Sequence, residues 1–184
     1  MSLVLGYSDR ESAIIMSDGR ARGEYFISEG YNKTRKIGKN IILGFVGGKE
    51  PAEYFLDCVH QSISGSEENC FAEDFLEVVE YGMERALKSG GFDATFLILG
   101  RKSDRVIVVS MAGKGINEGF ASKEVTEPRM QHIGGCIPHE EIGGVYSENM
   151  RNSDIPIFEC MRKTIMDVSV LDNSINTAIF VQTL

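Results

Sequence analysis

The N-terminal part of the chain alternates short apolar runs with polar turns. Leu3–Tyr7 and Ser12–Met16 are apolar, and the polar residues 8–11 between them predict a turn, so we expect these two runs to form a hairpin. Lys33–Ile37 and Asn40–Val46 predict a second hairpin, which turns at a Gly-Lys pair. The last run is almost entirely apolar, which is typical of a strand that is buried on both faces.

The period of the apolar positions changes after the second hairpin. Over residues 50–63, apolar side chains recur every three or four positions, which predicts an amphipathic helix. The same spacing predicts a helix over 73–88, and the pair Gly90-Gly91 marks its end. Two consecutive helices after four strands indicate that a helix pair covers one face of a sheet.

Strands and helices then return in separate blocks. Strands are expected over 94–99, 106–111, 116–120, 130–133 and 177–181, and helices from about His139 and over 157–170. Strands that cluster in runs favour antiparallel sheets over alternating strand–helix units. We therefore predict an α+β fold, a four-layer α/β/β/α sandwich with antiparallel sheets, in which residues 1–184 form a single domain.

Composition excludes several classes of protein. Hydrophobic residues make up 42% of the 184 residues and charged residues 25%, as in an ordinary globular protein. The net charge of −8 argues against a nucleic-acid partner, because phosphate binding requires a basic face. No apolar run approaches the roughly 18 residues of a membrane span, and no secretory signal is recognisable. We expect a cytoplasmic protein with no membrane partner, whose four cysteines are reduced thiols.

Five segments carry a resemblance to a known family. They read IIMSDGRA (14–21), KTRKI (33–37), ILGFVGG (42–48), DATFLILG (93–100) and IGG (133–135). In this order and spacing, the chain resembles the proteasome β subunits and the bacterial ATP-dependent peptidase of the same fold, which are N-terminal-nucleophile hydrolases. The resemblance covers nearly the whole chain. It implies the sandwich that the element order also predicts, and a homo-oligomer, which in related proteins is a closed ring.

In such enzymes the first residue of the processed chain attacks the scissile carbonyl, and its own free α-amine acts as the base. The resemblance implies that Lys33 takes the position of the lysine that disfavours protonation of this amine, and that Asp18 fixes this lysine. It also implies that Asp172 is a supporting acid and that the N–H of Gly47 stabilises the oxyanion. Phe45 matches the base of the specificity pocket, which would favour an apolar substrate side chain.

The nucleophile position corresponds to Ser2, counted back from Asp18 along the first hairpin. Its α-amine is free only after Met1 has been removed. The resemblance also implies two serines near the site. At one of these positions the chain has Gly135 instead, and near the last strand Ser174 is the nearest candidate for the other.

Two functions from different classes remain open, and with them whether the chain is an enzyme. The first is a threonine/serine-type peptidase or amidohydrolase that acts on peptide or amide substrates through an N-terminal nucleophile. The second is a non-catalytic member of the fold that serves assembly or ligand binding. In that case Asp18 and Lys33 would be a structural ion pair.

His132, Cys136 and His139 are residue types that bind zinc. Three ligands on one loop with no fourth nearby are a weak signal, and a loop that happens to hold two histidines is the better explanation. We therefore expect no metal and no cofactor.

Overall fold

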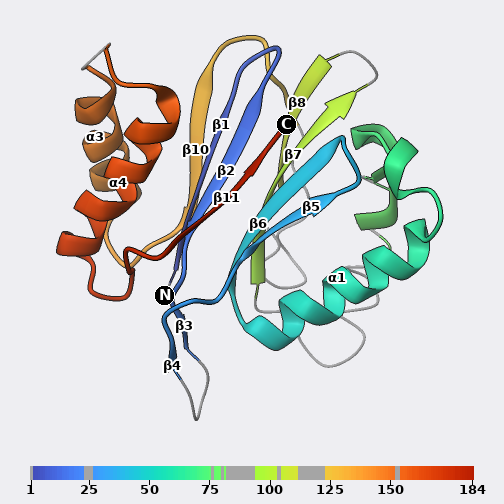
Figure 1. Cartoon of the computed structure of the whole chain (residues 1–184), viewed down its shortest axis with the longest axis horizontal. Helices are drawn as coiled ribbons and strands as arrows, with labels where there is room; N and C mark the ends of the chain where they lie inside the picture. Colours follow the sequence, from blue (N-terminus) through green and yellow to red (C-terminus); the bar gives the residue numbers. More distant parts are fainter. Residues whose placement is uncertain are drawn as a thin grey trace.

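Two antiparallel sheets lie face to face at the centre of the molecule, and helices cover their outer faces (Figure 1). The computed structural model describes residues 2–22, 27–75, 77–79, 81, 94–102, 105–111, 123–151 and 154–184. The layers follow the order helix, sheet, sheet, helix. This confirms the predicted α+β class and the four-layer α/β/β/α sandwich.

The first sheet has the strand order β10-β1-β2-β11. Its central strands, β1 (Leu3–Ser8) and β2 (Ala13–Asp18), form the predicted N-terminal hairpin. β10 (Arg129–Gly134) pairs antiparallel with β1, and β11 (Ile179–Thr183) pairs antiparallel with β2. The final strand begins two residues later than the sequence predicts. This arrangement places the start of β1 between the end of β2 and the end of β10.

The second sheet has the strand order β5-β6-β7-β8-β9. The strands are β5 (Thr34–Ile37), β6 (Ile41–Gly47), β7 (Ala94–Lys102), β8 (Arg105–Met111) and β9 (Lys123–Glu124). β5 and β6 form the second predicted hairpin, and β6 is buried along its whole length except at its last residue, as its apolar run predicts. The strand expected over 116–120 lies outside the described residues.

A third, two-stranded ladder extends from one end of the sandwich (Figure 1). It consists of β3 (Ala21–Arg22) and β4 (Ile27–Ser28). No apolar period predicts this ladder, because two-residue strands are too short to show one. A 3₁₀ turn, η1 (Glu67–Asn69), follows the first helix.

The helix α1 (Lys49–Ile63) covers the outer face of the second sheet. Its buried side chains have the predicted helical spacing, and they pack against Phe45 and Phe96 of the sheet: Ala52, Phe55, Leu56, Val59 and Ile63. Residues 72–75 and 77–79 are also helical and pack into the same core. Residues 82–88 of the helix predicted over 73–88 lie outside the described residues.

The helices α3 (His139–Met150) and α4 (Ile157–Leu171) cover the first sheet. Apolar side chains of α4 pack on Leu3 and Leu5 of β1, so the strand that leads to the candidate nucleophile is fixed from this side. Both helices occupy the predicted ranges. Within the described residues, no helix has the length and apolar character needed to cross a membrane. None of the four cysteines, all of which are described, forms a disulfide.

Candidate active site

The start of β1, the end of β6 and the segment before β5 meet at a small cavity of about 90 Å³. Four of the six residues that the sequence singled out line it: Ser2, Lys33, Phe45 and Gly47. Ala21, Tyr31 and Lys49 complete the lining. Two larger cavities, of about 360 and 530 Å³, lie along α3 and α4, and a third of about 410 Å³ lies at residues 9–11 and 126–128. The lining of these three includes none of the predicted site residues. The small cavity is therefore the place where groups with catalytic chemistry converge.

Asp18, the last residue of β2, lies directly behind this cavity and is fully buried. Its Oδ1 accepts hydrogen bonds from Lys33 Nζ at 2.8 Å and from the backbone N–H of Leu3 at 2.9 Å. Its Oδ2 accepts from the N–H of Arg20 at 2.9 Å and from the N–H of Asn176 at 3.5 Å. One carboxylate thus ties β1, β2, Lys33 and the segment before β11 together. Buried charges are tolerated only when they are paired and hydrogen-bonded in this way.

Lys33 is almost completely buried between Asp18 and the cavity. Its Nζ donates to Asp18 Oδ1 at 2.8 Å and to the Asp18 carbonyl at 3.1 Å. Burial lowers the pKa of Lys33 below its usual value, while the Asp18 carboxylate opposes this shift by favouring the charged form. An ammonium has three N–H donors, so the third is available to a group in the cavity.

Ser2 is nearly buried and lies just before the first residue of β1. Its Oγ donates to the carbonyl of Arg20 at 3.1 Å, and its own carbonyl accepts a hydrogen bond from the N–H of Gly135 at 2.8 Å. The N–H of the next residue, Leu3, donates to Asp18. Ser2 is therefore held from both neighbouring strands, with its side chain at the cavity.

Gly47 ends β6 and precedes α1, with Gly48 as the N-cap of that helix. Its φ of 104° lies in the region that only glycine adopts without strain. The N-terminus of α1 follows at Lys49, so the positive end of the helix dipole lies next to this turn. Such an environment stabilises a developing negative charge. Phe45, two residues earlier, is buried and lines the cavity.

Asp172 does not line the cavity. It follows α4, where its Oδ2 accepts from the N–H of Cys136 at 2.5 Å and its Oδ1 accepts from the N–H and Oγ of Ser174 at 2.9 and 2.5 Å. Burial raises the pKa of Asp172, but the hydrogen bonds from Ser174 and Cys136 outweigh it and leave the pKa below its usual value. Asp172 thus holds the loop after β10, whose Gly135 in turn contacts Ser2.

Residues at the mouth of the cavity were not singled out from the sequence. The Tyr31 hydroxyl donates to Glu53 Oε1, and Arg35 forms an ion pair with the same carboxylate at 3.4 Å. The ammonium of Lys49 lies 5.0 Å from the centre of the Tyr31 ring. Burial and the Glu53 carboxylate raise the pKa of Tyr31 far above its usual value. Tyr31 precedes Lys33 by two positions, and this spacing in an extended segment is the one sequence signal that would have indicated it.

The chain is similar to known proteins in structure and not in sequence. The chain matches no protein-family model, and no curated protein matches its sequence. Among solved structures, Anbu from Yersinia bercovieri, described as an ancestral β-subunit, aligns with a TM-score of 0.76 and 14% identity over 98% of this chain and 80% of that one. The Gly-1 mutant of Anbu from Hyphomicrobium sp. strain MC1 aligns with a TM-score of 0.75 and 16% identity, over 100% and 82% of the two chains.

Eukaryotic HslV from Trypanosoma brucei also aligns, with a TM-score of 0.58 and 13% identity over 99% of this chain and 98% of that one. The chain has a proteasome-subunit-like fold. At these identities the likeness shows the fold alone. What this proteasome-like chain does with its cavity has to be argued from the side chains that line it.

The structure brings two members of the histidine–cysteine cluster together and separates the third. His132 Nε2 and His139 Nδ1 are 2.6 Å apart, whereas Cys136 Sγ lies 3.4 Å from Ser174 Oγ. Burial and the neighbouring His139 lower the pKa of His132. Within the described residues, no group of three or more histidine, cysteine or acidic side chains is placed to hold a metal ion.

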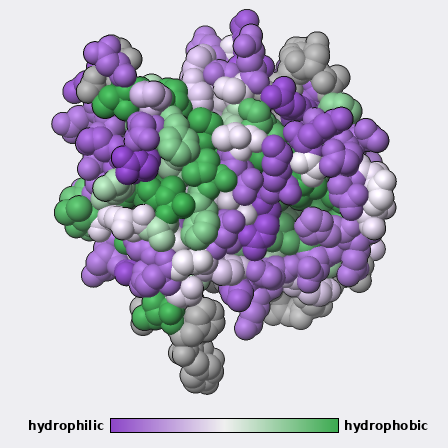
Figure 2. Space-filling view, in the orientation of Figure 1, coloured by the Kyte–Doolittle hydropathy of each residue, from purple (hydrophilic) through white to green (hydrophobic). Residues whose placement is uncertain are grey.

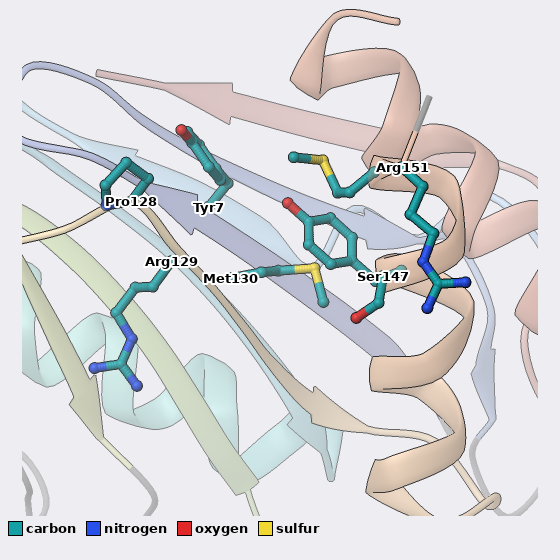
Figure 3. Close-up of a pocket in the computed structure, with 8 residues that line it drawn as sticks. Tyr7, Pro128, Arg129, Met130, Ser147 and Arg151 are labelled. Atoms are coloured by element: carbon teal, nitrogen blue, oxygen red, sulfur yellow. The ribbon is translucent and has the colours of Figure 1, made fainter. Parts of the chain in front are cut away.

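A second cavity of the proteasome-like fold, of about 360 Å³, lies between β1, β10 and α3 (Figure 3). Tyr7, Met130 and Tyr146 form its walls, and Arg129 and Arg151 stand at its edges with side chains that extend away from each other. It contains no nucleophile–base pair. It therefore does not compete with the smaller cavity as a candidate active site.

Proposed function

We propose that this proteasome-like protein is an N-terminal-nucleophile peptidase or amidohydrolase of the threonine/serine type, with Ser2 as its nucleophile after removal of Met1. The observation that carries the proposal is the single small cavity lined by Ser2, Lys33 and Gly47. A hydroxyl, a buried lysine and a glycine turn at a helix N-terminus are the groups that acyl transfer requires.

In this proposal Ser2 Oγ attacks the carbonyl carbon of the substrate amide, and the free α-amine of Ser2 accepts the hydroxyl proton. The Lys33 ammonium disfavours protonation of that amine in the resting state, so that it remains a base near neutral pH. The Gly47 N–H stabilises the oxyanion. The amine then gives the proton to the leaving nitrogen as the C–N bond breaks. Water hydrolyses the resulting Ser2 ester and regenerates the hydroxyl.

The floor of the cavity supports a substrate with an apolar side chain. Phe45 is buried there, and the Arg35 guanidinium lies 5.9 Å from its ring centre. A volume of about 90 Å³ limits the side chain to a small or medium size. Asp172 serves in this proposal as a positioning residue, because it acts on Ser2 only through the loop that contains Gly135.

We further propose that the protein is a cytoplasmic homo-oligomer and that its subunits close into a ring. Exposed apolar side chains support an assembly, because large apolar patches on a monomer mark interaction surfaces. Hydrophobic surface gathers on the side where α3 and α4 lie (Figure 2). Four large apolar side chains of α4 are exposed: Phe158, Met166, Val170 and Leu171. The Anbu relative is itself described as a β-subunit.

The test combines intact mass with a hydroxyl-directed acylating probe. The proposal expects a mass without Met1 and one adduct on Ser2, together with hydrolysis of peptide amides that carry an apolar residue before the cut bond. Ser2→Ala and Lys33→Ala should abolish the adduct, whereas Ser64→Ala, at an exposed serine after α1, should retain it. Retention of Met1, or an adduct that survives Lys33→Ala, would overturn the mechanism.

Two observations favour the second function, a non-catalytic member of the fold that serves assembly or ligand binding. Ser2 Oγ already donates its proton to the Arg20 carbonyl, and Gly135 stands where a supporting serine is expected. In that case no probe adduct forms on Ser2 even after Met1 is removed, and Asp18 and Lys33 act only as a structural ion pair.

A further inference from the structure

Two histidines lie at the two ends of the loop after β10, whose Gly135 contacts the candidate nucleophile Ser2. His132 belongs to β10 and His139 is the first residue of α3, so the pair joins the two ends of the segment 133–138. The two ring nitrogens, Nε2 of His132 and Nδ1 of His139, are 2.6 Å apart. The ring centres are 4.7 Å apart and the planes are inclined by 35°.

The two nitrogens face each other across this contact. In a neutral pair one ring donates its N–H and the other accepts. When the donor ring moves its proton to its other nitrogen, both facing nitrogens present lone pairs. Metal–imidazole bonds of about 2.0–2.1 Å place two adjacent ligand nitrogens roughly 3 Å apart. The rings therefore need to separate by about 0.3–0.8 Å and to tilt so that both lone pairs point at one ion, and His139 has room to move because it is exposed.

We propose that His132 and His139 form a two-imidazole site for a divalent transition-metal ion, with water in the remaining coordination positions. Imidazole nitrogen suits zinc, copper and nickel, and carboxylate-preferring ions such as magnesium would not bind here. Glu140 and Glu141 in the first turn of α3, and the net charge of −8, favour the approach of a cation. Cys136 is not a ligand, because its Sγ lies against Ser174 on the other side of the loop.

The site would act on the loop that it closes. The N–H of Gly135 contacts the Ser2 carbonyl, and the N–H of Cys136 contacts Asp172. A metal ion that bridges His132 and His139 fixes both ends of this loop and so stabilises the two hydrogen bonds within it. The inference stands on the histidine geometry and holds whether or not Ser2 is a working nucleophile.

The experiment is a calorimetric titration of the chelator-stripped full chain with Zn²⁺ alone at neutral pH. One ion per chain should bind with micromolar affinity. His132→Asn and His139→Asn should each weaken binding at least about tenfold, since each removes one of two protein ligands. The chain has three histidines, so His60→Asn, at an exposed position of α1, is the matched control and should bind as tightly as the unsubstituted protein.

A second measurement reports on the loop. Hydrogen exchange at the amides of Gly135 and Cys136 should slow when Zn²⁺ is added to the unsubstituted protein, and should not respond in His139→Asn. Cys136→Ser should bind Zn²⁺ normally. Loss of binding in Cys136→Ser, undiminished binding in both histidine variants, or no binding by the unsubstituted chain would each overturn the proposal.

Discussion

Ser2 lies between two regions that hold it in different ways. On one side, Asp18 and Lys33 form a buried ion pair in which both carboxylate oxygens accept backbone N–H groups. On the other side, the loop after β10 reaches Ser2 through the backbone N–H of Gly135, at two glycines with φ near 85°. The first region depends on charge, and the second depends on backbone geometry. The ion pair and the loop should therefore be disrupted by different substitutions.

The ion pair should show the largest effect. Removal of one partner leaves the other charge buried without compensation, which costs about 3–5 kcal/mol. Asp18→Ala and Lys33→Ala should each lower the free energy of unfolding by this amount in urea denaturation, and Asp18→Ala should cost more because it also strands the N–H groups of Leu3 and Arg20. The double variant should cost less than the sum of the two single variants.

The matched control for this pair is Arg162→Ala. Arg162 and Glu159 form an ion pair on α4 at the same distance of 2.8 Å, but their side chains are 45% and 43% exposed. Exposed pairs contribute about 0–1 kcal/mol. If Lys33→Ala cost no more than Arg162→Ala, the Asp18–Lys33 pair would not be shielded from water as the structure indicates.

On the side of Ser2 that faces the loop after β10, a single added methyl group should lower the stability of the protein. An alanine Cβ at position 134 would lie 1.9 Å from the Ser2 carbonyl oxygen, and the φ of 85° is strained for any residue but glycine. Such backbone strain alone costs about 1–3 kcal/mol. Gly134→Ala should therefore lower the melting temperature by several degrees, at about 2–4 °C per kcal/mol for a chain of this size.

Gly144→Ala, in the helix α3 that follows the loop, should raise the melting temperature instead of lowering it. Gly144 lies inside α3, where an added Cβ meets nothing within 4 Å. Replacing a helical glycine by alanine stabilises a helix by about 0.5–1 kcal/mol. Equal melting temperatures for Gly134→Ala and Gly144→Ala would show that the contact between the loop and Ser2 carries no strain.

Features that depend on residue type can be predicted from the sequence, whereas features that depend on backbone geometry cannot. Apolar periods were enough for the hairpins, the helices and the layer order, because burial imposes those periods directly. The resemblance to the proteasome β subunits was enough to select Ser2, Lys33, Phe45 and Gly47, which line one cavity. It did not reveal that Asp172 reaches Ser2 only through Cys136 and Gly135, since backbone hydrogen bonds leave no residue-type signature. It also missed the β3–β4 ladder, and the His132–His139 contact could not be told from a chance pair.

The smallest destabilisation expected among the residues that hold Ser2 concerns Asp172, whose carboxylate accepts hydrogen bonds from the loop after β10 and from Ser174. Asp172→Asn replaces an oxygen that accepts from Cys136 or Ser174 with an amide donor, at a cost of about 1 kcal/mol at neutral pH. Because the folded pKa of Asp172 lies below the unfolded value of 3.8, its contribution is fully present above that pH and is lost as the pH falls through the folded pKa. Urea unfolding free energies of Asp172→Asn and the unsubstituted protein should therefore converge in acid. Ser174→Ala should lose part of the pH dependence, because it removes the side-chain hydrogen bond that lowers the pKa of Asp172 most. A difference that stays constant with pH would mean that the Asp172 hydrogen bonds act as neutral ones, and the loop side would then depend on geometry alone.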